Sequence, residues 1–405
     1  MDTDKVSGGP AFAEFVILIA LIISLVALSI DAMLPALPLI AGDLGVVEIN
    51  DSQYVISIFF AGMALGQILF GPMSDSLGRR PAIISGFAVF ALGCLLSITA
   101  ASFEQMLFGR FLQGLGASGP RIVSVALVRD RFKGREMARV MSFVMTVFIL
   151  VPVFAPAIGQ LILKLADWHY IYALFLVLSV VLVTWFWARQ PETLAPGNRI
   201  RFSLFRLLTD VRAILRIRVA LGYTLTMGFV FGAFIGYLSS SQQIFQVQYG
   251  LHEMFPLYFG ILATSIGCAS LLNARLVMRF GMRALSRFAL IAISFPSAAF
   301  FLVAYMHAGH PPLNWLMLYL LLQFFFFGIL FGNLNALAME PLGHVAGLGS
   351  ALVGSVSTLM SVVFGVVIAD AYDQTVLPLV AGFALLGMAS LVTMYWTESE
   401  DTTPN

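Results

Sequence analysis

Long, uninterrupted apolar runs are the feature that most limits what this chain can fold into. A helix needs about 20 mostly apolar residues to cross the ~30 Å hydrocarbon core of a bilayer. Membrane β-strands would instead alternate in polarity over about 10 residues. The sequence has twelve long runs that are apolar on every face: Phe15–Ile40, Gln53–Met73, Pro81–Ala101, Gln105–Val128, Met141–Leu163, Tyr170–Trp187, Val219–Ile244, Phe255–Val277, Phe288–His307, Leu313–Ala338, Val345–Ala369 and Val376–Met394. We therefore predict an all-α, polytopic membrane protein with twelve transmembrane helices.

The basic residues are divided very unevenly between the two sides of the predicted membrane. With the N-terminus placed in the cytoplasm, 19 of the 22 Lys and Arg fall on the cytoplasmic side, and only Lys164 falls on the other. Arg110 and Arg121 lie inside the fourth span. Because cytoplasmic loops carry an excess of Lys and Arg, this distribution predicts that both termini are cytoplasmic.

A hydrophilic segment divides the spans six and six. Residues 189–218 contain seven arginines together with Pro191, Pro196 and Gly197. We predict a cytoplasmic linker there, between one six-helix bundle over residues 1–188 and a second over residues 219–405. Residues 202–217 fit either a short amphipathic helix on the membrane surface or a solvated basic loop. A weak repeat, which places Gly78 over Gly281, supports duplication of a six-helix unit.

Charge is concentrated in GPMSDSLGRRP, residues 71–81, between the second and third spans. A glycine in this stretch permits a tight turn between two helices. The stretch resembles the loop 2–3 signature of the major facilitator superfamily. The resemblance implies that the Asp and Arg pair across the two halves and latch the cytoplasmic side shut in the outward-open state. The latch residues would be Gly71, Asp75, Gly78, Arg79 and Arg80. Because Met278 stands at the acidic position of the second copy, we expect one latch only.

Three further motifs extend the resemblance. GRFLQG, from Gly109, matches the Arg-x-x-Gln-Gly motif of the fourth helix. SIDAMLPALP, from Ser29, and YLSSSQQIFQVQYGL in the seventh helix are similar to the Bcr/CflA drug-efflux group. The fifth helix carries a variant of the proline–glycine motif of antiporter branches, at Pro152, Pro156 and Gly159.

The resemblance to a Bcr/CflA-type drug:proton antiporter implies a functional expectation. Such a protein is a monomeric transporter of the bacterial cytoplasmic (inner) membrane, which exports small amphipathic molecules in exchange for protons by alternating access. It needs no cofactor beyond the proton gradient, binds no nucleic acid and is not an enzyme. The alternatives are an exporter of a natural metabolite (a sugar, nucleoside, siderophore or amino-acid derivative) and, ranked lower, a proton symporter or a membrane enzyme. A catalytic or metal site is not expected, since the histidines lie in loops or at span ends.

Charged side chains inside a span are costly and usually face a cavity. Asp31 is the carboxylate well inside a span of the first half, and Arg110 and Arg121, about three turns apart, share a face of the fourth span. We expect Asp31 to pair with one of these arginines, and we predict Asp31 and Arg110 as the proton-coupling residues. A purely structural ion pair is the alternative. Arg121 is either a contact for a substrate anion or a structural residue.

The second half has only neutral polar groups deep in its spans, which suits substrate binding. Interhelical hydrogen bonds are the alternative role for each of them. We expect neutral, zwitterionic or weakly anionic substrates. The candidate cavity residues of both halves are Asp31, Arg110, Gln113, Arg121, Tyr237, Gln242, Gln323 and Asn333. Gly62, Gly66, Gly328 and Gly332 are predicted to let helices pack closely.

Overall fold

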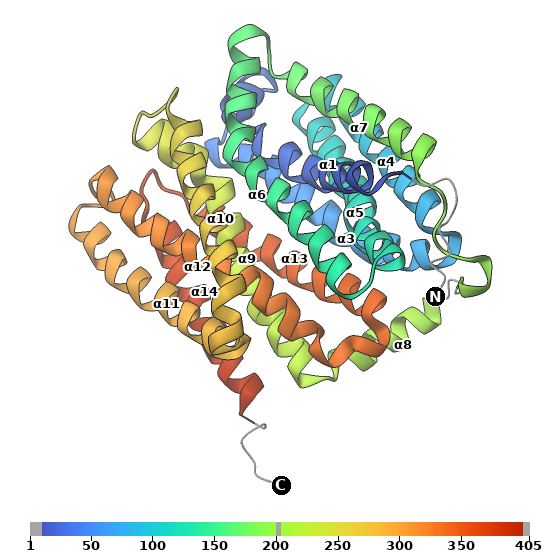
Figure 1. The fold of residues 1–405 in the computed structure, drawn as a ribbon. Coiled ribbons are helices and arrows are strands. Elements are labelled where there is room, and N and C mark those ends of the chain that lie inside the picture. The colour runs from blue at the N-terminus through green and yellow to red at the C-terminus, as the bar shows by residue number, and fades with distance from the viewer. Residues whose placement is uncertain (1–9, 200–203, 400–405) are drawn as a thin grey trace.

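The computed structural model describes residues 10–199 and 204–399, and its regular structure over those ranges is entirely helical (Figure 1). Within them, twelve helical segments are long and apolar enough to cross a membrane, which confirms the predicted fold class and number of spans. The long helices are α1 (Phe12–Asp31), α3 (Tyr54–Leu77), α4 (Arg79–Ile98), α5 (Phe103–Arg131), α6 (Gly134–Leu165), α7 (His169–Arg189), α9 (Arg218–Gln242), α10 (Phe255–Phe280), α11 (Met282–Met306), α12 (Leu313–Met339), α13 (Ala346–Asp370) and α14 (Leu377–Glu398).

Short helical elements complete the chain. They are the 3₁₀ turns η1 (Leu34–Ala36), η2 (Ile49–Gln53), η3 (Pro196–Asn198) and η5 (Glu340–Val345), the α-helices α2 (Leu37–Asp43) and α8 (Leu204–Leu215), and the π-helix η4 (Gln243–Gln248). Helix α8 lies in the segment between the two sets of spans, so the helical interpretation of that segment is confirmed over its bounds. Lys5, Arg201, Phe202 and both chain ends lie outside the described residues.

The helices pack in two groups that meet along two seams. In Figure 1 the blue-to-green helices lie together and the yellow-to-red helices lie together. Helix α5 packs mainly against α3 and α4, and α9 packs mainly against α13 and α14. Between the groups, α3 packs along α13 and α6 packs along α10. Polar side chains near α3 and α13 therefore lie where a transporter of two halves would bind its substrate.

The first span is interrupted inside the membrane, where the sequence had predicted one continuous run. Helix α1 ends at Asp31, the turn η1 follows, and α2 resumes at Leu37. Pro35 and Pro38 have no backbone N–H, so they cannot donate the hydrogen bonds that would continue an α-helix. The break leaves Asp31 at the C-terminal end of a helix, within the apolar region of the protein.

Helix α6 approaches this break with a glycine. A Cβ atom at Gly159 would lie only 1.8 Å from the carbonyl oxygen of Ala32, the residue after Asp31. Two other glycines also lie against backbone oxygens. A Cβ atom at Gly62 would lie 2.1 Å from the carbonyl oxygen of Phe111, and a Cβ atom at Gly328 would lie 2.4 Å from that of Ile266. The close-packing role predicted for Gly332 is wrong, since among the described residues no atom beyond its own turn of helix lies within 4 Å of its Cβ position.

The variant Gly159→Ala should lower both melting temperature and transport, because α6 must move away from the break to admit a methyl group. Overpacking of this kind costs about 1–3 kcal/mol. Gly332→Ala is the matched control, since its site has room for the methyl. Melting curves of the two purified variants in detergent, with transport in vesicles, make the comparison. A Gly159→Ala protein that matches Gly332→Ala in both would mean that the close approach is unimportant.

Candidate functional site

Arg110 is the centre of a buried network in the first half. Its side chain is 0% exposed. Nε donates to the carbonyl oxygen of Val55 at 3.1 Å, and Nη1 donates to the carbonyl oxygen of Ser29 at 3.1 Å and to Oε1 of Gln113 at 2.6 Å. Gln113 in turn donates to the Gly93 carbonyl and to Ser97 Oγ, at 3.1 and 2.9 Å. The network ties α5 to α1, α3 and α4, and it places Gln113 in the helix packing rather than on a cavity wall.

Asp31 lies close to this network but is not part of it. The residue is 5% exposed, and within residues 10–199 and 204–399 its carboxylate has no hydrogen-bond or ion-pair partner. The expected ion pair with Arg110 or Arg121 is therefore not formed in this structure. The physical reason is the break in the first span. The last carbonyls of a helix lack partners and carry partial negative charge, so they attract the guanidinium of Arg110 at Ser29 instead.

Tyr237 of α9 comes from the second half of the chain to the neighbourhood of Asp31. The Asp31 carboxyl acts electrostatically on the Tyr237 phenol, and the buried hydroxyl has no hydrogen-bond partner among the described residues. The ring packs edge-on against Phe324 with centroids 4.6 Å apart, and it stacks on Phe259 at 6.0 Å. The structure thus brings together two predicted site residues, one from each half, that both have unused polar groups.

The other predicted cavity residues of the second half have different surroundings. Asn333 and Asn273 exchange two hydrogen bonds of 2.9 and 3.0 Å between α12 and α10, which is the interhelical role given as the alternative. Gln242 donates to Gln246 at 2.9 Å within the end of α9 and the π-helix that follows. Gln323 is fully buried, and neither atom of its amide has a partner in the described part of the chain.

A cluster of polar side chains joins the halves where α3 begins and α13 ends, which we call the outer end. Asn50 donates to the carbonyl oxygens of Asp370 and Tyr372 at 3.1 and 3.0 Å. Gln53 donates to Gln243 at 2.5 Å, and the Tyr54 hydroxyl donates to Asp370 at 3.2 Å. We did not predict this cluster from the sequence. The signal that was present is the polar run Asn50–Tyr54 at the start of the second span.

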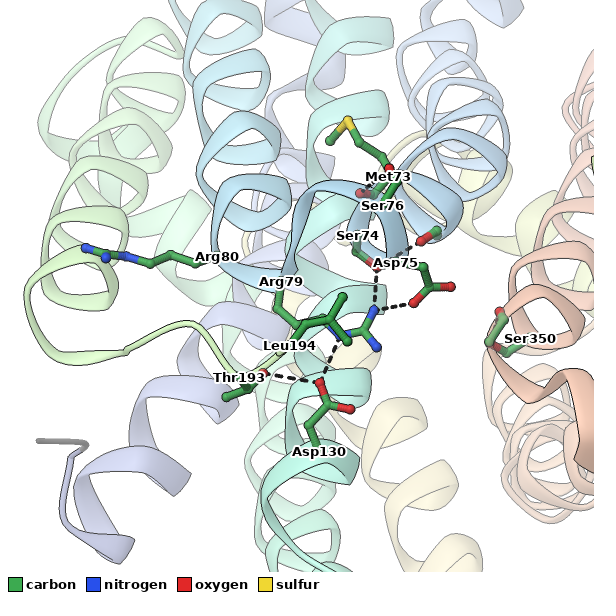
Figure 2. A network of polar contacts seen from close by, with 12 residues as sticks. Met73, Ser74, Asp75, Ser76, Arg79, Arg80, Asp130, Thr193, Leu194 and Ser350 are labelled. Carbon is green, nitrogen blue, oxygen red and sulfur yellow. Dashed lines mark hydrogen bonds and ion pairs between the residues drawn. The ribbon is translucent and has the colours of Figure 1, made fainter. Parts of the chain in front are cut away.

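At the opposite end, the predicted latch residues form a network that stays within the first half (Figure 2). Arg79 donates to Asp75 at 2.5 Å and to Asp130, at the end of α5, at 2.9 Å. In this structure the Asp and Arg of the motif therefore pair within the first half, and the pairing across the halves that was expected for the outward-open state is not formed between them. Gly78 has φ +116°, which a residue with a side chain rarely adopts, and this turn brings Arg79 back over both carboxylates.

Two residues that we did not predict complete the latch network. The first is Asp130, described above. The second is Glu192, which accepts hydrogen bonds from the backbone N–H groups of Arg79 and Arg80, each at 3.0 Å, and so caps the start of α4. The Arg80 side chain turns away and donates to the carbonyl oxygen of Trp187 at 2.6 Å. Acidic residues so distant along the chain give no local signal, which explains why the sequence did not reveal them.

The link from the latch to the second half is made by Asp75 rather than by an ion pair. A Cβ atom placed on Gly347, in the first turn of α13, would lie 3.4 Å from Oδ2 of Asp75. Figure 2 shows the Asp75 carboxylate facing Ser350 of the same helix. Because the start of a helix carries partial positive charge, a carboxylate is stabilised there. Asp75 therefore lies at the seam between the halves, and Arg79 holds it in place.

Comparison with known proteins fits this arrangement. The sequence model of the Major Facilitator Superfamily matches residues 19–365. The chain is 32% identical over 336 residues to the MFS-type transporter YdgK of Bacillus subtilis, covering 82% of this chain and 83% of that protein. It is 29% identical over 392 residues, 96% of each chain, to a bicyclomycin resistance protein homolog of Haemophilus influenzae.

Solved structures show the same fold. The human organic anion transporter MFSD10 (TETRAN) superposes with a TM-score of 0.70 at 20% identity, over 96% of this chain and all of that one. The identity is low, so this likeness concerns the fold alone. The family model, the relatives and the motifs agree, and the chain belongs to the major facilitator superfamily of transporters.

Proposed function

We propose that this transporter exports small amphipathic molecules, antibacterial drugs among them, in exchange for protons by alternating access. A relative that matches nearly the whole chain is named for bicyclomycin resistance, which supports drug efflux. The Bcr/CflA-like motif around Asp31 and the antiporter motif of the fifth helix point the same way. We place the protein in the bacterial cytoplasmic membrane, as its bacterial relatives suggest, and propose that it works as a monomer. The distribution of its basic residues places both termini in the cytoplasm.

The observation that carries the proposal is the buried carboxylate of Asp31, which has no partner among the described residues and lies within electrostatic reach of Tyr237 in the other half. An ionised carboxylate in an apolar environment without a partner is costly, so it must bind a proton, bind a cation or reach water. A cavity that opens first to one side and then to the other offers Asp31 each of these in turn. A proton taken up outside and released inside would enter once per cycle.

Competition couples this proton to the substrate. If a substrate in the same cavity favours the deprotonated form of Asp31, proton and substrate cannot occupy the site together. The proton then enters as the substrate leaves, which is exchange rather than co-transport. Arg110 would support the site by holding the end of α1, through its bond to Ser29, in the same place throughout the cycle.

Everted membrane vesicles test the proposal directly. Drug susceptibility of cells with and without the protein first identifies a transported drug. Everted vesicles whose interior is then acidified by respiration should accumulate that drug, and nigericin, which collapses the pH gradient, should release it. Accumulation that survives nigericin would remove the proton from the mechanism. Accumulation that requires an alkaline interior would instead indicate a symporter.

A further inference from the structure

Arg121 is the second arginine inside the fourth span, and its surroundings differ from those of Arg110. In the described part of the chain its one hydrogen-bond acceptor is the Met63 sulfur, 3.3 Å from Nη1, and no carboxylate lies within ion-pair distance. A thioether is a weak acceptor, and a guanidinium has several further N–H donors. By contrast, Arg79 has two carboxylates and Arg110 has three oxygen partners. Among the described residues, no carboxylate therefore balances the charge of Arg121 inside its span.

The guanidinium of Arg121 lies close to the seam between the halves. Side chains of a helix point towards its N-terminus, and for α5 this direction leads away from the latch end and into the membrane. Met63, which it reaches, is in the middle of α3. The next residue, Ala64, accepts a hydrogen bond of 2.8 Å from Ser355 of α13. Arg121 is also partly exposed, so its remaining donors are open to a molecule between the helices.

Pro120, the residue before Arg121, lines a small apolar gap between α1, α4 and α5. The gap measures about 10 Å³, and its other walls are Ile22, Leu25 and Val26 of α1, Phe87 and Phe90 of α4, and Ala117 of α5. Residues four apart on a helix share a face, so Ala117 and Arg121 face the same side of α5. The gap is too small to hold a ligand in this structure, but it shows that this side of α5 is apolar, and in apolar surroundings a charge-assisted hydrogen bond to an anion is strengthened.

We propose that Arg121 binds the anionic group (a carboxylate, sulfonate or phosphate) of a substrate that lies between the two halves. The inference rests on the proposed function in that it names the kind of molecule carried, and it requires the anionic group to be held at Arg121, about three turns of α5 from Arg110, rather than against the Asp31 carboxylate. The ligand would supply the missing counter-charge, and the guanidinium would hold its oxygens by charge-assisted hydrogen bonds. Uncharged analogues of the same shape would lose these bonds and bind more weakly.

Matched probes in detergent test this assignment. The affinities of the purified protein for 2-naphthoate, 2-naphthalenesulfonate and 2-naphthyl phosphate are compared with that for the uncharged 2-naphthamide, by the ligand-induced rise in melting temperature. We expect at least one anion to bind at least about tenfold more tightly than the amide, a difference of about 1.4 kcal/mol. Arg121→Gln should abolish this preference, and Arg121→Lys should keep most of it.

The controls separate recognition from folding and from general surface charge. Arg275→Gln removes an exposed arginine of α10 and should leave the preference unchanged. The melting temperature without ligand shows whether each variant is folded. No preference for any anion in the wild type, or a preference that survives in folded Arg121→Gln, would overturn the proposal. Stabilisation by phosphatidylglycerol but by none of the naphthyl anions would assign Arg121 to a lipid headgroup and would also overturn it.

These measurements need no pH gradient, so they are independent of proton coupling. Anion binding that depends on Arg121, in a protein that fails to accumulate any drug in everted vesicles, would leave the inference standing without the proposed exchange. Gradient-driven drug accumulation by a protein that shows no selectivity for anions would leave the proposed exchange standing and overturn the inference about Arg121.

Discussion

Asp31→Asn is expected to lose pH-gradient-driven export completely and to keep the ability to bind substrate. The amide is close in shape to the carboxyl group and occupies the same buried position, but it cannot take up or release a proton. Export by the variant should fall to the level of protein-free liposomes. In reconstituted liposomes with an imposed pH gradient, uphill movement of the drug at the wild-type rate would place the coupling residue elsewhere.

The pH dependence of substrate binding is a second test of the Asp31→Asn variant. If proton and substrate compete at Asp31, wild-type affinity should weaken as pH falls, and the affinity of Asp31→Asn should be the same at every pH. Asp51→Asn serves as the control, because it removes a carboxylate at the outer end of the second span, away from the buried site. It should bind and export as the wild type does. A pH dependence that persists in Asp31→Asn would contradict competition at this residue.

Arg110→Ala is expected to cost several kcal/mol of stability, with loss of export as a consequence. The substitution leaves the carbonyls of Val55 and Ser29 and the amide oxygen of Gln113 without their donor. Each buried polar group left unsatisfied costs about 1–3 kcal/mol. Arg110→Lys, which keeps the charge but not the fork of donors, should retain more function. Yield and melting temperature in detergent measure the loss, and Arg275→Ala on the exposed surface of α10 is the control.

A double variant distinguishes the observed network from the ion pair that the sequence suggested. Removal of one member of a buried ion pair leaves the other uncompensated, so neutralising both should restore stability. In this structure Arg110 holds backbone carbonyls and not Asp31. The stability losses of Asp31→Asn and Arg110→Ala should therefore add. Recovery of stability in the double variant would show that the two residues pair in a state that dominates in solution.

The sequence alone determined the class of this protein, the number of its spans and the motifs of its family. Each of these depends on local properties. A run of apolar residues must be helical in a bilayer, because every backbone polar group has to be satisfied within the segment. The latch signature and the Arg-x-x-Gln-Gly motif are likewise short patterns, and the structure places their residues Asp75, Arg79, Arg110 and Gln113 in polar networks. The prolines at 35 and 38 could also have predicted the break in the first span.

Only the tertiary structure decided which partner each polar group takes. Arg110 lies near the break that exposes the Ser29 carbonyl, so it binds that oxygen and leaves Asp31 unpaired. Arg79 finds Asp130 at the end of another helix, and Arg121 finds only a sulfur. The physical reason is the distance along the chain over which each property acts. Hydrophobicity and helical period act over a few residues, whereas a hydrogen bond or an ion pair depends on distances of a few ångströms between helices that are remote in sequence, and these are fixed only when the helices pack.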